Sequence, residues 1–148
     1  MRSLIETVRF AEKFCKLIWW NFGPRINGMY YCEDGQAIIF LAKHIASNST
    51  LIKSTIAEEL GHHFTSEYKD WSAPCFSYGD RLGLNRTEYR ALRWAADFLI
   101  DDQEIIHAGR EVALAGYVDD IEQLAERFEV SPEIIIIKYH LLELQELI

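Results

Sequence analysis

The sequence of 148 residues predicts an α+β protein that is mostly helical. Apolar residues recur at helical spacing near both ends of the chain and in its middle, whereas one short stretch has the composition of two strands around a turn. With 49% apolar residues and four tryptophans, the chain can bury one good core. We therefore expect residues 1–148 to form a single domain, with the C-terminal helical segment at about 118–148 as part of the same unit.

The N-terminal part predicts a helix followed by a small hairpin. Apolar residues at helical spacing predict a first helix that ends near Trp19, before Gly23-Pro24. The turn chemistry of Glu33-Asp34-Gly35-Gln36 predicts a hairpin between Met29–Cys32 and Ala37–Leu41. The apolar positions of the first helix are Leu4, Val8, Ala11, Phe14 or Cys15, and Ile18.

The next predicted helix begins near the capping residues Ser47-Asn48-Ser49-Thr50 and contains two carboxylates and two imidazoles close together. A zinc peptidase helix normally reads His-Glu-x-x-His, with both histidines on one face and the glutamate acting on the metal-bound water. Here Glu58 occupies the place of the first histidine and His62 that of the second. Glu59 falls within the buried arc of this apparently amphipathic helix, where an ionised carboxylate needs a compensating group. We interpret that group as a metal-bound water.

A third ligand is expected from the helix at residues 85–100. Glu88 begins an apolar stripe at helical spacing, and the small alanines of that stripe would let the two helices approach closely. Two alternatives need no metal. Glu58 and His62 could form an ordinary ion pair one turn apart, with His63 in the core. Asn85 and Glu88 could instead form a variant of the capping box.

These motifs, in this order, resemble the ImmA/IrrE family of small metallopeptidases of phages, integrative elements and their bacterial hosts. The resemblance implies a zincin-like core with Glu58, His62 and Glu88 as metal ligands, Glu59 as the general base, and Zn²⁺ as the ion, with Mn²⁺ as the alternative for a site richer in carboxylates. It extends from about Gly28 to the C-terminus. The segments that carry it are Gly28-Met29-Tyr30-Tyr31, Ala37–Leu41, Ala57–His63 and Glu88-Tyr89-Arg90-Ala91 with Trp94-Ala95-Ala96.

Further polar groups near these motifs are candidates for contacts to the oxyanion or to the substrate, although each residue type is more often structural. An irregular connection from Tyr68 to Asn85, with Pro74 and two glycines, is expected to border the substrate cleft. The candidates are His63, Tyr68, Tyr78 and His107.

The family resemblance also implies a partner, a helix-turn-helix repressor of a phage or mobile element that this antirepressor would cleave or inactivate. The alternative is a scaffold of the same fold that binds a regulator or a toxin-antitoxin partner without catalysis. Residues 121–132 themselves resemble the start of a helix-turn-helix unit, but the isoleucines that follow predict packing. With a formal charge of −8 and no basic stripe, direct DNA binding is disfavoured.

The cellular location is predicted from the cysteines and the N-terminus. Cys15, Cys32 and Cys75 are odd in number and lack CxxC spacing, which predicts neither a disulfide framework nor a cysteine zinc site. Charged residues interrupt every apolar run near the N-terminus, so no signal peptide or membrane span is expected. These features are typical of a reduced cytoplasm, and the family resemblance implies that of a bacterial host.

Overall fold

The protein is an α+β fold that is mostly helical, which confirms the predicted fold class. The computed structural model describes residues 1–66, 71–76, 86–116 and 120–148, and only the backbone of 71–76. The regular elements of these residues are α1 (Leu4–Ala11), β1 (Lys16–Trp20), β2 (Ile26–Glu33), β3 (Gln36–Ala42), the 3₁₀ turn η1 (Lys43–Ile45), α2 (Ser49–Thr65), β4 (Trp71–Phe76), α3 (Arg86–Leu99), α4 (Asp102–Leu114), α5 (Asp120–Phe128) and α6 (Pro132–Leu144).

The four strands form one sheet in the order β1-β3-β2-β4. β2 is antiparallel to both β3 and β4, whereas β1 runs parallel to β3. The turn between β2 and β3 uses Asp34 and Gly35 at positive φ, 49° and 76°. Two such residues in sequence match the twist of a two-residue hairpin. The predicted hairpin is therefore confirmed.

Two predictions about the strands are wrong. The first helix ends at Ala11 and not near Trp19, because Lys16–Trp20 forms β1. Its β-branched and aromatic residues suit a strand, and the pairing with β3 outweighs their chance helical spacing. The connection from Tyr68 to Asn85 is not wholly irregular, because it contains β4. Pro74 is compatible with β4 since this strand lies at the edge of the sheet.

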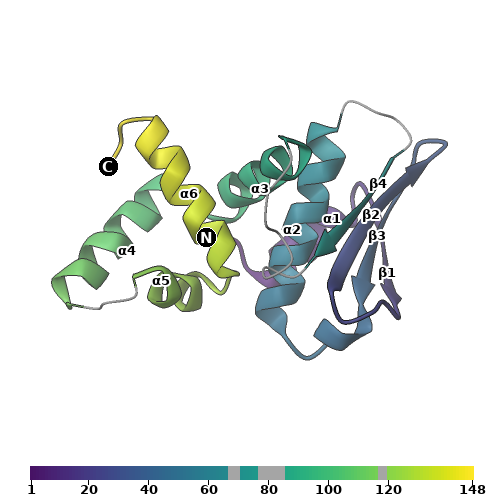
Figure 1. Ribbon diagram of the computed structural model, residues 1–148, viewed down its shortest axis with the longest axis horizontal. Helices are drawn as coiled ribbons and strands as arrows, with labels where there is room; N and C mark the ends of the chain where they lie inside the picture. The colour runs from purple at the N-terminus through teal and green to yellow at the C-terminus, as the bar shows by residue number, and fades with distance from the viewer. Residues whose placement is uncertain (67–70, 77–85, 117–119) are drawn as a thin grey trace.

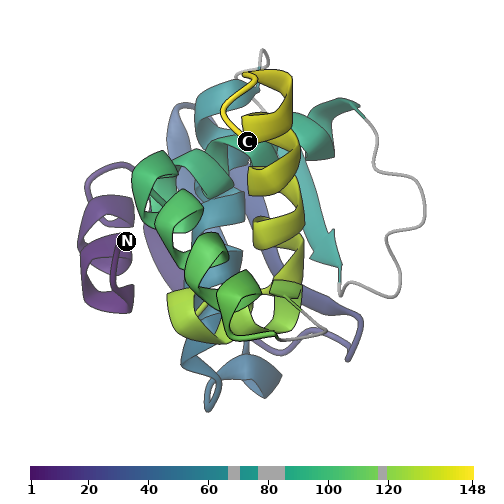
Figure 2. The same ribbon diagram turned by 90° about the vertical axis from the view of Figure 1, so that its left-hand side faces the viewer.

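Helix α2 lies in the middle of the molecule, between the sheet and the helices α3 to α6 (Figures 1 and 2). Ten consecutive residues, Lys53 to His62, are buried, so this part of the helix is enclosed on all faces. The expectation that the helix is amphipathic is therefore wrong. Ile56 and Leu60 belong to a core shared with α1 and the sheet. Ala57 belongs to a second core, formed with α3, α4, α5 and α6. One helix thus takes part in both cores.

The C-terminal helices confirm that the isoleucine-rich segment is used for packing. Ser131 is the N-cap of α6 and Pro132 opens the helix. Lys138 is also buried in this helix, at 2% exposure. Its ammonium lies 2.8 Å from Asp97 at the end of α3 and 2.5 Å from Asp102 at the start of α4. The isoleucines Ile134, Ile135 and Ile137 are buried.

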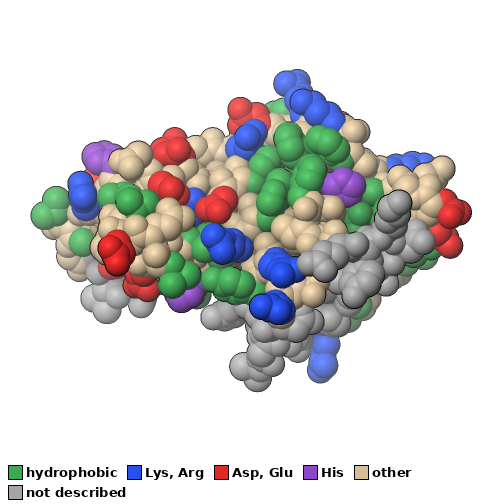
Figure 3. Space-filling view, turned by 90° about the horizontal axis from the view of Figure 1, so that it is seen from above, with side chains coloured by type: hydrophobic (Ala, Val, Ile, Leu, Met, Phe, Trp, Pro, Cys, Tyr) green, Lys and Arg blue, Asp and Glu red, His purple; other side chains and the backbone are tan. Residues whose placement is uncertain are grey.

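Aromatic side chains from α1, α2 and α3 form a continuous layer, which we call the aromatic patch. Its rings lie between 4.8 and 6.5 Å from one another, centroid to centroid, along the contacts that link them. Figure 3 looks onto the C-terminal end of α2, where hydrophobic side chains gather beside a histidine. The members are Phe10, Phe14, His63, Phe64, Trp94 and Phe98.

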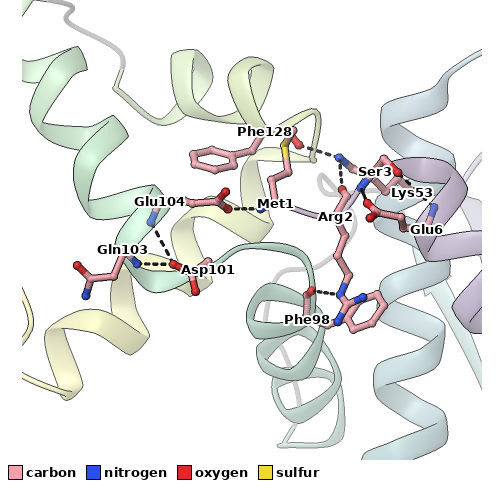
Figure 4. A network of polar contacts seen from close by, with 10 residues as sticks. All are labelled: Met1, Arg2, Ser3, Glu6, Lys53, Phe98, Asp101, Gln103, Glu104 and Phe128. Atoms are coloured by element: carbon pink, nitrogen blue, oxygen red, sulfur yellow. Dashed lines mark hydrogen bonds and ion pairs between the residues drawn. The ribbon is translucent and has the colours of Figure 1, made fainter.

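Residues before α1 connect the two cores through polar contacts (Figure 4). Lys53 of α2, at 1% exposure, donates to the carbonyl oxygens of Phe128 at 2.7 Å and of Arg2 at 3.3 Å. The Arg2 side chain donates in turn to the carbonyl oxygen of Phe98 at 2.9 Å. The amino terminus pairs with Glu104 of α4. The N-terminal segment therefore fastens α2 to the C-terminal helices.

No helix among the described residues combines the length and apolar composition that a bilayer crossing requires.

Of the cysteines, Cys15 and Cys32 are described, and both are free thiols. Cys15 is buried between α1 and β1, at 5% exposure. Burial, with nearby Cys32 and Glu59, raises the pKa of the Cys15 thiol to about 12.

We expect the contribution of Cys15 to stability to fall as the pH rises from about 9 towards about 12. The pKa of this thiol is raised from 9.0 to about 12 on folding. Between these values the thiol is deprotonated in the unfolded chain but still protonated in the folded protein, which lowers the free energy of the unfolded state relative to the folded state. Urea unfolding of the wild type and Cys15→Ala at a series of pH values measures the effect. The difference between their free energies of unfolding should be constant near neutral pH and fall above about pH 9. A constant difference at alkaline pH would contradict the prediction.

Candidate metal centre

Helix α2 places Glu58 and His62 on one face because they are four residues apart. The helix begins where the sequence predicted, with Asn48 as N-cap accepting a hydrogen bond from the Leu51 amide at 3.0 Å. Both side chains are withdrawn from water, with Glu58 at 4% exposure and His62 at 0%. The first two predicted ligands thus lie side by side in a buried environment.

Glu88, in the first turn of α3, lies opposite this pair. Its carboxylate oxygen Oε2 is 3.3 Å from His62 Nε2, and its side chain is 22% exposed. Glu58, His62 and Glu88 each offer one ligand atom, and these atoms lie within 4.8 Å of one another. The three residues predicted to share an ion are therefore brought together by two neighbouring helices. The alternative capping role of Glu88 involves Asn85, which lies outside the described residues.

A glycine allows the two helices to approach at this point. A Cβ atom on Gly61 would stand 2.2 Å from the carbonyl oxygen of Ala91, so the backbone of α3 occupies the space of a side chain. The close approach was predicted from the alanines of α3, but the part played by Gly61 was missed. Its position directly before His62, within a helix that glycine disfavours, is the signal that could have revealed it.

Glu59 lies on a different face of α2, against the sheet. It is fully buried, and its Oε1 atom is 3.3 Å from the Cβ position that a side chain at Gly28 would occupy. The same Cβ position is 2.5 Å from Thr55 Cγ2 and 3.0 Å from the carbonyl oxygen of Phe40. Because Gly28 has no side chain, β2 leaves space for the Glu59 carboxylate.

The other predicted contact residues have different surroundings. His63 faces β2 and α1, with Nδ1 sharing a hydrogen bond of 3.0 Å with the Tyr30 hydroxyl. Burial lowers the pKa of His63 and raises that of Tyr30, which favours the neutral form of both. His107 does not join the group, because it lies on α4 with a side chain that is 73% exposed and 3.4 Å from Glu111. Tyr68 and Tyr78 lie outside the described residues.

The chemistry of the donor set fits a divalent metal. Oxygen and nitrogen ligands bind Zn²⁺ at about 2.0–2.2 Å, so two ligands of one ion lie at most about 4.4 Å apart. The limit of 4.8 Å between the three candidate atoms is close to that spacing. Two carboxylates would also balance the charge of the ion. Oxygen-rich sites suit Mn²⁺ as well as Zn²⁺, so the donors leave both ions open.

Comparison with known proteins identifies the family. The sequence model of the Peptidase_M78 family, described as the IrrE N-terminal-like domain, matches residues 22–140, which is most of the chain. The chain belongs to this family. A search among curated proteins finds no match to it. The match spans β2, α2 and α3, and hence the candidate ligands Glu58, His62 and Glu88 as well as Glu59.

Membership in the IrrE N-terminal-like family confirms the resemblance inferred from the sequence and assigns the protein to a metallopeptidase-type family. A metal is therefore implied for this fold, and the group formed by Glu58, His62 and Glu88 is a possible place for it. The roles of these residues as ligands, and of Glu59 as a base, remain predictions.

Replacing Gly61 by alanine is expected to lower the free energy of unfolding by about 1–3 kcal/mol, because the new methyl group forces α2 and α3 apart. In a helix without this contact, replacing glycine by alanine would raise the stability by about 1 kcal/mol. A lower free energy of unfolding in Gly61→Ala is therefore due to the contact with Ala91. Urea unfolding gives the stability, and titration with zinc gives the affinity, which should fall as Glu88 moves away from His62. The matched control is Gly23→Ala, where nothing lies within 4 Å of the added atom. Equal stability of both variants would refute the prediction.

Replacing Gly28 by alanine is expected to destabilise the protein by a similar amount, about 1–3 kcal/mol, and Thr55→Ser should restore part of the loss. The rescue follows because serine lacks the methyl group Cγ2 that the added Cβ would meet at 2.5 Å. A double-mutant cycle of Gly28→Ala and Thr55→Ser measures the coupling between the two sites. Strict additivity of the two substitutions would show that the contact is not the cause.

Proposed function

We propose that the protein is a metal-dependent endopeptidase whose substrate is a helix-turn-helix transcriptional repressor of a phage or mobile element. The observation that carries the peptidase proposal is the grouping of Glu58, His62 and Glu88 within 4.8 Å, with Glu59 buried on the same helix. Membership in a metallopeptidase-type family supports it. The repressor as substrate rests on the resemblance to the ImmA/IrrE family.

In this proposal, Glu58, His62 and Glu88 hold the ion. A bound divalent ion would polarise a water molecule and the carbonyl group of the scissile peptide bond. Glu59 accepts a proton from the attacking water and then delivers it to the nitrogen of the leaving amine, so that the carboxylate is regenerated. Glu59 is fully buried, with Oε1 beside the position that a side chain at Gly28 would occupy.

The charge of the site makes Glu59 more important than in a site with two histidines. Two carboxylates and one imidazole leave a divalent ion formally neutral, whereas two imidazoles and one carboxylate leave one positive charge. A less positive centre lowers the pKa of a bound water less. Either the proton acceptor therefore contributes more, or the enzyme is slow, or the ion is a harder one such as Mn²⁺.

The test separates metal binding from catalysis. We expect protein purified without chelator to contain about one equivalent of metal per chain by elemental analysis, and His62→Ala to lose it. Glu59→Gln should keep the metal but cleave a helix-turn-helix repressor substrate roughly 10²–10⁴-fold more slowly, because the amide cannot accept the proton. Glu122→Gln, an exposed residue of α5, is the control and should behave as the wild type.

Three results would overturn the proposal. If Glu59→Gln cleaves the repressor as fast as the wild type, Glu59 is not the base. If neither protein cleaves the repressor although both bind it, the protein is a non-catalytic scaffold of the same fold. If the wild-type protein contains no metal and the metal content of His62→Ala is the same, the proposed metal centre is rejected.

A further inference from the structure

The aromatic patch continues from the buried core to the surface. Phe10, Trp94 and Phe98 pack against the core shared by the sheet and α2. Phe14 and Phe64 extend outward, with 44% and 41% of their surfaces exposed. Their rings contact each other edge to face at 5.0 Å. A contiguous exposed aromatic surface of this kind is costly in water and is typical of a binding site for another molecule.

Cations border these rings. The Arg2 guanidinium lies 4.4 Å from the ring centroid of Phe98 and 5.7 Å from that of Phe10. The Lys13 ammonium lies 5.9 Å from the Phe10 centroid. Each cation is within the distance at which a ring face attracts a positive charge. Figure 3 shows Lys and Arg side chains, together with some Asp and Glu side chains, beside the hydrophobic surface.

The N-terminal segment that supplies Arg2 and Lys13 carries a net positive charge, opposite to that of the whole protein. Residues 2–16, which include α1, contain four cations and two carboxylates, whereas the chain carries a formal charge of −8. One of the two carboxylates, Glu6, is engaged in the capping box of α1 with Ser3. The four cations are Arg2, Arg9, Lys13 and Lys16.

The patch adjoins the candidate metal centre through both ligand-bearing helices. His63 and Phe64 directly follow His62 on α2. Trp94 lies on α3, which also carries Glu88, and its ring stacks on that of Phe64 at 4.9 Å. The patch and the candidate metal centre therefore share the helices α2 and α3.

We propose that the aromatic patch docks an acidic segment of the protein partner that carries aromatic or large aliphatic side chains. The apolar side chains of this segment contact Phe14 and Phe64, and its carboxylates pair with the cations at the border. Complementarity of charge selects this occupant, since an acidic segment is attracted to the border and a basic one is repelled. The proposal rests on the proposed function for the identity of the partner as substrate, but docking requires neither the metal nor Glu59.

Fluorescence anisotropy of labelled synthetic peptides tests the docking directly. The probe is a peptide of about a dozen residues in which aspartates and glutamates alternate with phenylalanine and leucine. A second peptide has lysines in place of the acidic residues, and a third has serines in place of the apolar ones. We expect the first peptide to bind, more weakly at high salt, and the other two to bind at least about tenfold more weakly.

Matched variants locate the binding surface. Phe64→Ser should weaken binding of the acidic peptide by about tenfold or more, and Lys13→Glu by several-fold. The controls are Trp20→Ser, which removes an aromatic residue of β1 that is 54% exposed, and Lys43→Glu, which reverses an exposed charge on η1. Urea unfolding of each variant verifies that it is folded.

Unchanged binding in Phe64→Ser and Lys13→Glu would overturn the docking proposal, as would equal binding of the lysine peptide. A loss of binding in Trp20→Ser equal to that in Phe64→Ser would place the peptide elsewhere and also reject it. These readouts are independent of cleavage. A failure of docking leaves the result of the Glu59→Gln experiment unaffected, and an inactive enzyme that still binds the peptide leaves docking intact.

Discussion

The contact between α2 and α3 at Gly61 is the constraint on which the candidate centre depends. The carbonyl oxygen of Ala91 occupies the place of a Gly61 side chain, so the two helical backbones touch there. Only at this separation can Glu88, from the first turn of α3, reach within 3.3 Å of His62. The absence of one methyl group on α2 thus fixes the relation between two segments that lie 26 residues apart in the chain, from His62 to Glu88.

The second consequence of this packing is electrostatic. Glu58 and Glu59 are almost completely buried on one helix, and Glu88 of the next helix lies close to Glu58 and His62. Withdrawing several like charges from water is unfavourable unless positive charge or protons accompany them. A resident divalent cation would relieve this cost. In that case the ion would also contribute to the stability of the fold, as it does in other proteins whose metal sites are assembled by folding.

The sequence predicts local features of this protein better than distant ones. The hairpin depends on Asp34-Gly35, and the start of α2 depends on Asn48, so a few neighbouring residues suffice for each. Strand β1 could not be found in this way, because its apolar residues also fit a helical period and its partner β3 is distant in sequence. β4 was hidden by Pro74, which an edge strand tolerates. The grouping of Glu58, His62 and Glu88 was anticipated by spacing and family resemblance, whereas Gly61 acquires meaning only once Ala91 is placed beside it.

The enclosure of α2 has a consequence for its dynamics. Because this helix contributes to both cores, its backbone amides become accessible to solvent hydrogen exchange only when both cores open. We therefore expect the segment from Lys53 to His62 to exchange slowly, with protection close to that set by global unfolding. Glu58, Glu59 and His62 are thereby held on an element that opens only together with the cores around it.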